Sequence, residues 1–319
     1  MRLLRGLSTP AIDRSGCVAT IGNFDGVHLG HQYIIQQVIT KAKALCLPSV
    51  AIIFEPQPLE FFKGADAPAR LLSFREKFQA LSEFELDYVF CLKFDLSLSR
   101  LSALDFIEQV LVAHLNVKHL VIGDDFRFGG DRKGDFSLLV QSGETLGFSV
   151  ENTQTRVDTL LEVGQRISST RLRECLAQGD FTAATSLLGR PYCMTGRVIH
   201  GQKLGRTLGF PTANIALNRV NVPLAGVYVV RFFCSKGMVI DGVANVGVKP
   251  TVGNFKPSLE VHLLDFQGDL YGERATVQFL SKVRDEQRFS GIEALTEQIQ
   301  KDIDAARVYL ASKETDDLK

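Results

Sequence analysis

A short loop between a predicted strand and a predicted helix decides the fold and supplies the first candidate site. The apolar run Cys17–Ile21 is followed by Gly22-Asn23-Phe24-Asp25-Gly26-Val27-His28-Leu29-Gly30-His31. Beyond the loop, apolar residues recur at helical spacing as far as Leu45, so the chain passes from a strand through a glycine-rich loop into a helix. A helix N-terminus carries partial positive charge and free backbone N–H groups. This order of elements predicts an anion site at the end of a strand.

Two histidines give this loop a chemical character. His28 and His31 are three residues apart at the helix start, so their imidazoles can lie on one face. Gly30 between them leaves room for a ligand or backbone to approach. Such a site suits a triphosphate, especially the charge that develops on its α-phosphate during in-line attack. An ordinary turn with surface histidines is the simpler alternative, but it leaves the coincidence of two histidines and three glycines unexplained. Neither of the two common glycine-rich phosphate motifs occurs in the chain.

The composition excludes several classes of protein. The 319 residues hold 36 Lys plus Arg and 36 Asp plus Glu, so no bulk charge attracts nucleic acid or an anionic membrane. No stretch approaches the roughly 20 apolar residues of a membrane helix, and the N-terminus lacks the pattern of a signal peptide. The six cysteines are scattered without a Cys-x-x-Cys pair, which favours reduced thiols. We expect a cytoplasmic protein that binds neither nucleic acid nor membranes.

The first half of the chain alternates between strand and helix patterns. Its strands are continuous apolar runs, which is typical of a parallel sheet covered by helices on both faces. We expect strands at 17–22, 49–54, 87–92, 118–122 and 148–152, and helices at 31–46, 74–84, 103–114, 135–145, 168–177 and 180–188. The pattern predicts a doubly wound, Rossmann-like α/β domain over residues 1–188, with ligands bound at the carboxyl ends of the strands.

The pattern changes after Gly189-Arg190-Pro191. The following segments alternate between apolar and polar residues, as in Leu259-Glu260-Val261-His262-Leu263, and are joined by loops with Gly and Pro. We expect strands near 193–200, 225–234, 238–246, 258–266 and 275–283, and an amphipathic helix at 291–310. Residues 189–319 are therefore predicted to form an antiparallel β-barrel domain with a C-terminal helix, and a sandwich is the alternative.

Two further segments of the first half carry candidate ligand-binding residues. Gly123–Gly130 follows a predicted strand and contains Asp125, so its polar and aromatic groups fall in the same crevice as the histidine loop; an ordinary turn is the alternative. Ile167-Ser168-Ser169-Thr170-Arg171 opens a predicted helix, where Ser and Thr are common capping residues. Beside a triphosphate, Arg166, Ser169 and Thr170 are instead suited to the β- and γ-phosphates, and we favour this hypothesis.

The second half contains a loop with phosphate-binding character and one isolated carboxylate. Gly205 and Arg206 lie in a flexible loop before the segment Gly-Phe-Pro-Thr-Ala-Asn, whose Thr212 and Asn214 offer hard oxygens of the kind that hold Mg²⁺. Glu260 alternates with apolar neighbours on its strand and is a candidate general base toward a hydroxyl. Taken alone, a plain barrel connection and a solvated glutamate are the better explanations.

With these motifs, the chain resembles the bacterial bifunctional riboflavin kinase/FMN adenylyltransferases, also called FAD synthetases, over nearly its whole length. The matching segments are residues 22–31, Phe54-Glu55-Pro56-Gln57-Pro58, Gly123–Gly130, Ile167–Arg171, Gly205–Asn214, Asn245–Thr251 and Leu259–His262. The resemblance implies two reactions. The barrel would phosphorylate riboflavin with ATP to give FMN, and the N-terminal domain would transfer AMP from a second ATP to FMN, giving FAD and pyrophosphate.

The resemblance also implies roles for individual residues of the first domain. His28 and His31 stabilise the adenylyl transition state. The triphosphate is held by Arg166, Ser169 and Thr170, and Asp125 lies against the flavin or the nucleotide. The remaining nucleotide-binding positions of the loop are Gly22, Asn23, Phe24, Asp25 and Gly30.

In the second domain, the resemblance implies that Gly205 and Arg206 bind nucleotide phosphates. Thr212 and Asn214 organise Mg²⁺ with ATP as co-substrate, Glu260 activates the ribityl hydroxyl, and Arg284 contacts the flavin. The implied partners are riboflavin, FMN, FAD and ATP.

Two alternatives come from other functional classes. A class I aminoacyl-tRNA synthetase also uses a His-x-Gly-His loop, but it needs a second loop with a catalytic lysine and usually a tRNA-binding appendage. Ile167–Arg171 and the zero net charge disfavour it. A non-catalytic flavin-binding protein that kept the fold is the second alternative, against which Glu260, Thr212 and the paired histidines argue.

Overall fold

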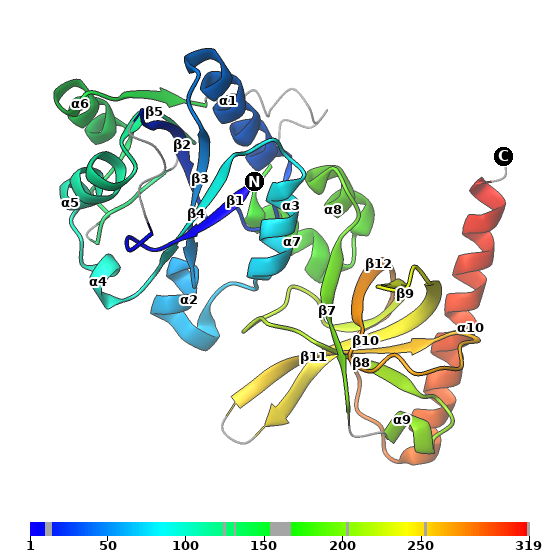
Figure 1. Ribbon diagram of the computed structural model, residues 1–319. Helices are drawn as coiled ribbons and strands as arrows, with labels where there is room; N and C mark the ends of the chain where they lie inside the picture. Colours follow the sequence, from blue (N-terminus) through cyan, green and yellow to red (C-terminus); the bar gives the residue numbers. More distant parts are fainter. Residues whose placement is uncertain are drawn as a thin grey trace. The chain divides into compact units, whose positions relative to one another are not determined.

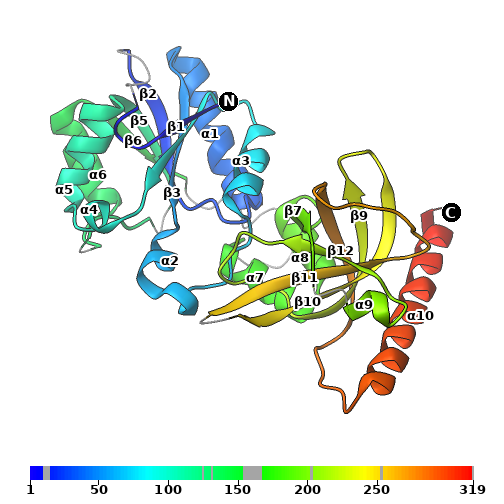
Figure 2. The same ribbon diagram turned by 60° about the horizontal axis from the view of Figure 1, so that its bottom comes forward.

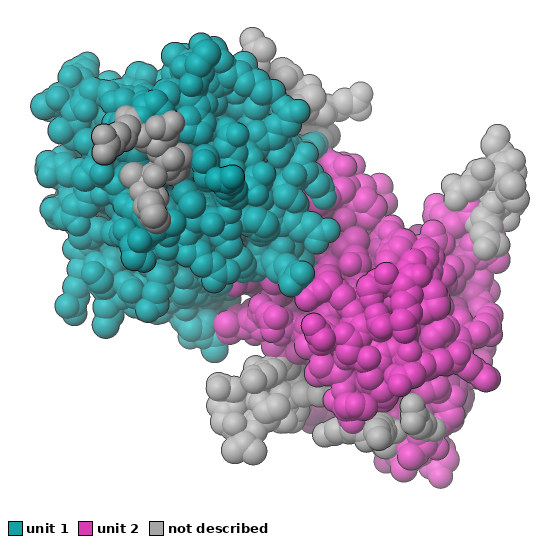
Figure 3. All heavy atoms as spheres, viewed as in Figure 1, with its two compact units in different colours: residues 1–68, 74–168 teal, residues 69–73, 169–319 magenta. Residues whose placement is uncertain are grey.

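The computed structural model describes residues 1–9, 15–123, 126–130, 132–153, 167–201, 204–251 and 254–317. The chain forms two compact units, which Figure 3 shows in two colours. The first unit contains residues Met1–Pro68 and Phe74–Ser168, and the second contains Ala69–Ser73 and Ser169–Lys319.

The first unit is built on a six-stranded sheet with the order β1-β4-β3-β2-β5-β6. Its neighbouring strands run parallel, so the predicted Rossmann-like sheet is confirmed. The strands are β1 (Arg2–Arg5), β2 (Cys17–Ile21), β3 (Ser49–Glu55), β4 (Tyr88–Lys93), β5 (Val117–Ile122) and β6 (Ser149–Asn152). The sequence analysis missed the edge strand β1.

Helices cover both faces of this sheet, with α1 and α3 on one side and α5 and α6 on the other (Figures 1 and 2). Residues of β2 alternate between the two faces, and its residues Ala19 and Ile21 share a core cluster with Ile107 and Leu139. All five residues of β2 are buried, which explains why four of them are apolar and the fifth is the small Thr20. The helices are α1 (Leu29–Leu45), α2 (Pro58–Lys63), α3 (Phe74–Ser82), α4 (Leu96–Ser99), α5 (Ala103–Phe106) and α6 (Phe136–Leu146), with a 3-10 turn at Gly64–Asp66 and a π-helix at Ile107–His114.

The strand order places two loops at one crevice. From β2 the chain crosses to β3 on one side, whereas β5 pairs with β2 on its other side. The carboxyl ends of β2 and β5 are therefore neighbours at the point where the strand order reverses, which is where such sheets bind ligands. The histidine loop follows β2, and the segment that begins at Gly123 follows β5.

The second unit is a closed six-stranded barrel with the order β10-β11-β8-β7-β12-β9. Its paired strands run antiparallel, which confirms the predicted barrel over the sandwich. The strands are β7 (Cys193–Ile199), β8 (Thr212–Ala216), β9 (Gly226–Cys234), β10 (Val239–Thr251), β11 (Asn254–Leu263) and β12 (Arg274–Arg284), and the helices are α7 (Ser169–Gln178), α8 (Phe181–Leu188), α9 (Leu204–Thr207) and α10 (Ile292–Asp317).

The C-terminal helix α10 packs along the barrel beside β9, β10 and β12 (Figure 1). Its buried residues Ile303 and Ala306 join Val227, Val229 and Val243 of the barrel in one core cluster. The burial of this apolar face removes hydrocarbon surface from water and fixes α10 to one side of the barrel.

Helix α8 and a short segment of the preceding chain also pack on the barrel. The Phe181 ring lies 5.8 Å from the Tyr228 ring and 6.0 Å from the Phe279 ring, measured between centroids. Arg219 donates hydrogen bonds to the backbone oxygens of Arg70 and Leu71 at 3.2 and 2.9 Å. The second unit therefore includes residues before 189, while the predicted boundary between activities at 188/189 stays a prediction.

This packing predicts that two fragments of the second unit differ in thermal stability. A fragment Ser169–Lys319 should melt cooperatively, and at a higher temperature than a fragment Leu187–Lys319. The shorter fragment loses Phe181 from the aromatic contact, and loss of a buried phenylalanine side chain typically costs about 3 kcal/mol or more. Both fragments lack residues 69–73, so the comparison isolates the two helices. Circular dichroism melts measure the difference, and equal melting temperatures would contradict the assignment of α7 and α8 to the barrel unit.

Candidate active sites

The two histidines of the first unit lie against each other at the start of α1. His28 is the N-cap, and its Nδ1 accepts a hydrogen bond from the backbone N–H of His31 at 3.3 Å. The two rings stack with centroids 3.7 Å apart and planes 14° apart, and Phe24 meets the His31 ring edge-on at 5.2 Å. Because Nδ1 of His28 is an acceptor, a neutral His28 carries its proton on Nε2. The structure thus brings the predicted pair together at a helix N-terminus.

The backbone of this loop takes a conformation that few residues adopt. Phe24 and Val27 have φ angles of 45° and 43°, which is unusual for residues other than glycine and especially for a β-branched one. Both side chains are buried, so packing holds the backbone in place. Gln32 adds a hydrogen bond from Nε2 to the Val27 backbone oxygen at 3.0 Å. Strained backbone of this kind is concentrated at functional sites.

Gly30 leaves room for neighbouring groups of the protein, whereas the sequence suggested room for a ligand or backbone. A Cβ atom at this position would lie 3.2 Å from the His28 ring and 3.6 Å from the Ile167 carbonyl oxygen. The space beside Gly30 is therefore filled by the protein itself, and the absence of a side chain permits the stacking of His28 on its neighbour.

His31 stays neutral over a wide pH range. Burial lowers the pKa of His31 well below its ordinary value, and the neighbouring His28 and Lys77 lower that pKa further. Its Nδ1 is buried and makes no hydrogen bond within the described part of the chain. Lys77 of α3 is itself fully buried. A buried cationic neighbour and a helix N-terminus create a positive potential here, which suits a bound phosphate.

The structure does not assemble all the residues predicted for the first site. Asp125 and Arg166 lie outside the described residues. Ser169 and Thr170 begin α7, which belongs to the second unit, so their grouping with the histidines stays a prediction. In the loop itself, Asn23 is exposed and Asp25 is buried.

The second unit contains a cavity of about 320 Å³. One part of its wall is apolar and is formed by barrel residues together with α10, and the other part carries polar and charged side chains. The lining residues include Gly205, Leu208, Phe210, Thr212, Val227, Val243, Asn245, Glu260, His262, Arg284, Glu286, Gln287, Phe289, Leu295, Ile299, Asp302 and Ile303. Predominantly apolar walls with a few polar groups are typical of small-molecule sites.

Strand pairing gathers the polar groups of this cavity around Glu260. On β11, Glu260 lies directly opposite Asn214 of β8 and directly opposite Asn245 of β10. Residues opposite each other on neighbouring strands project from the same face of the sheet. Thr212 Oγ1 adds a hydrogen bond to Glu260 Oε2 at 3.4 Å. Asn214, Glu260 and Asn245 therefore form one polar row across three strands, and Thr212, which pairs with His262, is joined to this row by its hydrogen bond.

The donor set of this row fits a hard divalent cation. Hydroxyl and amide oxygens are ligands that Mg²⁺ accepts when nucleotide phosphates complete its coordination. A Cβ atom at Gly201 would overlap the end of the Asn214 side chain, so the absence of a side chain at Gly201 leaves the space that this amide occupies. Within the described residues there is no group of three or more His, Cys, Asp or Glu arranged to hold a metal by themselves.

The structure places most of the predicted cavity residues and adds several others. Gly205, Thr212, Glu260 and Arg284 line the cavity, whereas Asn214 is not among the lining residues, and Arg206 is described only as part of the backbone of α9. The sequence analysis missed Asn245, His262 and Phe289. His262 is two residues beyond Glu260 on the same strand, so the two-residue period of a strand could have found it. Asn245 required the strand register.

The lowered pKa of His31 makes a prediction for stability. Below about pH 6.5 the unfolded chain binds a proton at His31 that the folded chain does not, so the free energy of unfolding falls as the pH falls. A His31→Asn variant lacks this contribution of His31 to the pH dependence of the unfolding free energy. Between pH 6.5 and 5, wild type should lose up to about 1.4 kcal/mol per pH unit more than the variant. Urea unfolding at several pH values measures this, and parallel pH profiles would contradict a neutral His31.

Comparisons with known proteins agree with this division into two sites. Residues 11–171 match the family model of FAD synthetase, and residues 188–310 match that of riboflavin kinase. The chain is 28% identical to a solved structure titled as a macrolide-efflux protein from Streptococcus pneumoniae, with a TM-score of 0.77 and coverage of 96% of this chain and 99% of the other. Among the described residues there is no helix long and apolar enough to cross a membrane.

Curated relatives match almost end to end. The chain is 52% identical to the bifunctional riboflavin kinase/FMN adenylyltransferase of Pseudomonas fluorescens, covering 98% of each chain. It is 47% identical to the protein of the same name from Escherichia coli strain K12, covering 97% of this chain and 98% of the other. With this identity over nearly the full length, the chain belongs to the family of bifunctional riboflavin kinase/FMN adenylyltransferases.

Proposed function

We propose that this protein phosphorylates riboflavin with ATP to give FMN, and then transfers AMP from a second ATP to FMN to give FAD. The observation that carries this proposal is the presence of two separate sites in one chain. The stacked histidines begin α1 in the first unit, and the polar row around Glu260 lies in the barrel cavity. Each site has the chemistry that one of the two steps requires.

In the first unit, an oxygen of the FMN phosphate attacks the α-phosphorus of ATP. The bond from that phosphorus to the β-phosphate bridge breaks, and pyrophosphate leaves. His28 and His31 donate hydrogen bonds to the charge that develops on the α-phosphate, beside the free N–H groups of the helix start. Gly22–Asp25 and Gly30 shape the nucleotide loop. Asp125 lies against the ligand, and the other phosphates are held by Arg166, Ser169 and Thr170.

In the barrel, the terminal hydroxyl of the ribityl chain attacks the γ-phosphorus of ATP, and ADP leaves. Glu260 accepts the hydroxyl proton. Thr212 and Asn214 would hold Mg²⁺, with Gly205 and Arg206 on the phosphate side. Bound Mg²⁺ supplies charge neutralisation to the phosphates. The apolar wall of the cavity accommodates the flavin ring, and Arg284 contacts its polar edge.

The same proposal covers the division of the chain and its location. We place the boundary between activities at 188/189, with adenylyl transfer in residues 1–188 and phosphorylation in residues 189–319. The two family matches support this, since one ends at residue 171 and the other begins at residue 188. Riboflavin, FMN and ATP are small soluble molecules, which is consistent with action in the cytoplasm.

Variants at the two sites should block opposite steps. The double variant His28→Ala/His31→Ala should convert riboflavin to FMN at the wild-type rate and lose FAD formation by roughly 10²–10³-fold or more, because such donors act on the transition state. Glu260→Gln keeps the size of the side chain but removes the base, and should slow FMN formation by about 10²–10⁴-fold. Chromatography of riboflavin, FMN and FAD separates the products.

Each variant serves as the control for the other. The Glu260→Gln protein supplied with FMN should make FAD at the wild-type rate, which shows that its first unit is folded. Near-normal FAD formation by the histidine variant would remove His28 and His31 from the chemistry. A loss under tenfold in Glu260→Gln would show that this carboxylate is not the base.

A further inference from the structure

Helix α10 contributes a buried carboxylate to the wall of the barrel cavity. Asp302 is 3% exposed and lines the cavity beside Ile303, whose side chain packs into the barrel core. Burial of a carboxylate is costly unless it is paired and fully hydrogen-bonded. The buried carboxylate of Asp302 should therefore have a charged partner at the cavity.

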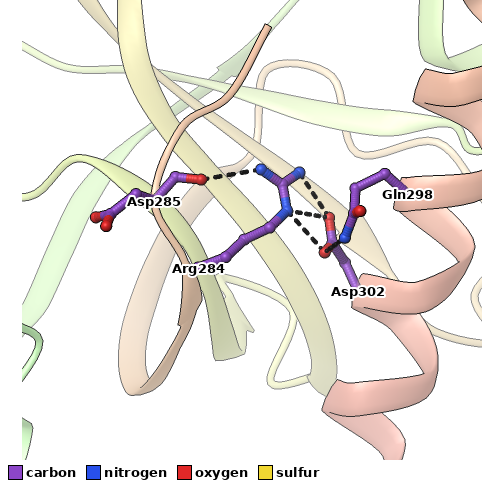
Figure 4. A network of polar contacts seen from close by, with 4 residues as sticks. All are labelled: Arg284, Asp285, Gln298 and Asp302. Carbon is purple, nitrogen blue, oxygen red and sulfur yellow. Dashed lines mark hydrogen bonds and ion pairs between the residues drawn. The ribbon is translucent and has the colours of Figure 1, made fainter. Parts of the chain in front are cut away.

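The partner of Asp302 is Arg284, at the end of β12 (Figure 4). Nε of Arg284 lies 2.8 and 3.1 Å from the two carboxylate oxygens, and Nη2 lies 2.8 Å from Oδ2. Gln298, one turn earlier on α10, donates from Nε2 to Oδ1 at 2.9 Å. Both oxygens of Asp302 thus accept hydrogen bonds from defined directions, which fixes the carboxylate and the plane of the guanidinium.

The opposite side of the guanidinium is also fixed. Nη1 of Arg284 donates to the Asp285 backbone oxygen at 3.0 Å, and Figure 4 shows the guanidinium between that carbonyl and the Asp302 carboxylate. The Phe289 ring lies 5.6 Å from Cζ of Arg284, within the range of a cation–π contact. Arg284 is therefore held on three sides while it lines the cavity.

We propose that Asp302 is a positioning residue for riboflavin phosphorylation. It orients Arg284 toward the flavin before the substrate binds, and Gln298 orients Asp302 in turn. This inference rests on the proposed kinase function of the barrel. Holding a long side chain in its bound geometry removes the entropy cost of ordering it on binding, so Asp302 acts on the affinity for riboflavin. Proton removal depends on a different carboxylate, Glu260.

The Asp302→Asn variant tests this. Asparagine keeps the size and one acceptor oxygen but removes the charge that pairs with Arg284. The KM for riboflavin should rise roughly 10- to 100-fold, as for loss of hydrogen bonds to a charged group. The kcat of phosphorylation should stay within about threefold, since a loss of uniform binding affects KM alone. The KM for ATP in this step and the conversion of FMN to FAD should be unchanged.

The chain offers a matched control on the same helix. Gln300 donates to Asp304 at 2.9 Å with the same four-residue spacing, and Asp304 is exposed. Asp304→Asn should leave the KM for riboflavin at its wild-type value. If Asp302 had a purely structural role, Asp302→Asn would lower kcat together with kcat/KM for riboflavin and kcat/KM for ATP. A rise in the riboflavin KM with little change in kcat therefore separates the two roles.

A double variant shows whether Asp302 acts through Arg284. If it does, Arg284→Met/Asp302→Asn should have the same riboflavin KM as Arg284→Met alone, within about twofold. Additive losses would overturn the proposal. The proposal would also be overturned if wild type makes FMN and the Asp302→Asn variant has the same riboflavin KM as wild type. Failure of wild type to make FMN would contradict the kinase function itself.

Thermal melts show whether Asp302→Asn is folded at the assay temperature. If it is not, Gln298→Met provides the milder test, because it leaves the ion pair and removes only the hydrogen bond that orients Asp302. Its riboflavin KM should rise about threefold, consistent with one hydrogen bond, and that of Gln300→Met should not change. An unchanged riboflavin KM in Gln298→Met would then overturn the proposal.

Discussion

The pairing of β11 with β8 on one side and with β10 on the other is the constraint on which the barrel site depends. It sets Asn214, Glu260 and Asn245 in one row across three strands. Because side chains alternate along a strand, a shift of the register by one residue would turn Glu260 away from this face. Closure of the barrel removes exposed strand edges and resists such a shift. The polar chemistry of the cavity therefore depends on the hydrogen bonds of the sheet, and α10 closes the cavity by packing on the same barrel.

The candidate sites of the two units differ in the groups that they present to phosphate. In the first, burial and the neighbouring His28 and Lys77 lower the pKa of His31 at the start of α1, so the site presents N–H donors and the helix terminus to an anion. In the second, the hydroxyl of Thr212, the amide of Asn245 and the carboxylate of Glu260 line a cavity whose walls are otherwise mostly apolar, and oxygens of these kinds are ligands that a hard divalent cation accepts. The first site thus supplies positive potential from the protein, whereas the second offers oxygen atoms of the kind that bind a metal–nucleotide complex.

The sequence predicted the helices and strands in which apolar residues form a clear run or recur at a regular spacing. Strands β2 and β3 are buried on both faces, and their apolar runs identified them. Strand β1 has only four residues with arginine at both ends, which is too short for any period. Strand β8 follows a proline and reads Thr-Ala-Asn-Ile-Ala, with little apolar alternation. For the sites, the histidine pair was readable because its spacing along the helix is local. Asn245 and Asp302 were not, since strand register brings the first to the cavity and the docking of α10 brings the second, and Phe289 lies in the irregular loop between β12 and α10, which has no period.

The central claim is that one chain carries out two successive ATP-dependent reactions on the flavin. The most direct measurement is a time course with riboflavin, ATP and Mg²⁺, in which flavins, ADP and pyrophosphate are all quantified. FMN should appear first and then decline as FAD forms. ADP should equal the sum of FMN and FAD, and pyrophosphate should equal FAD. Formation of FMN without FAD when ATP is in excess, or formation of FAD without an equal amount of pyrophosphate, would contradict this claim.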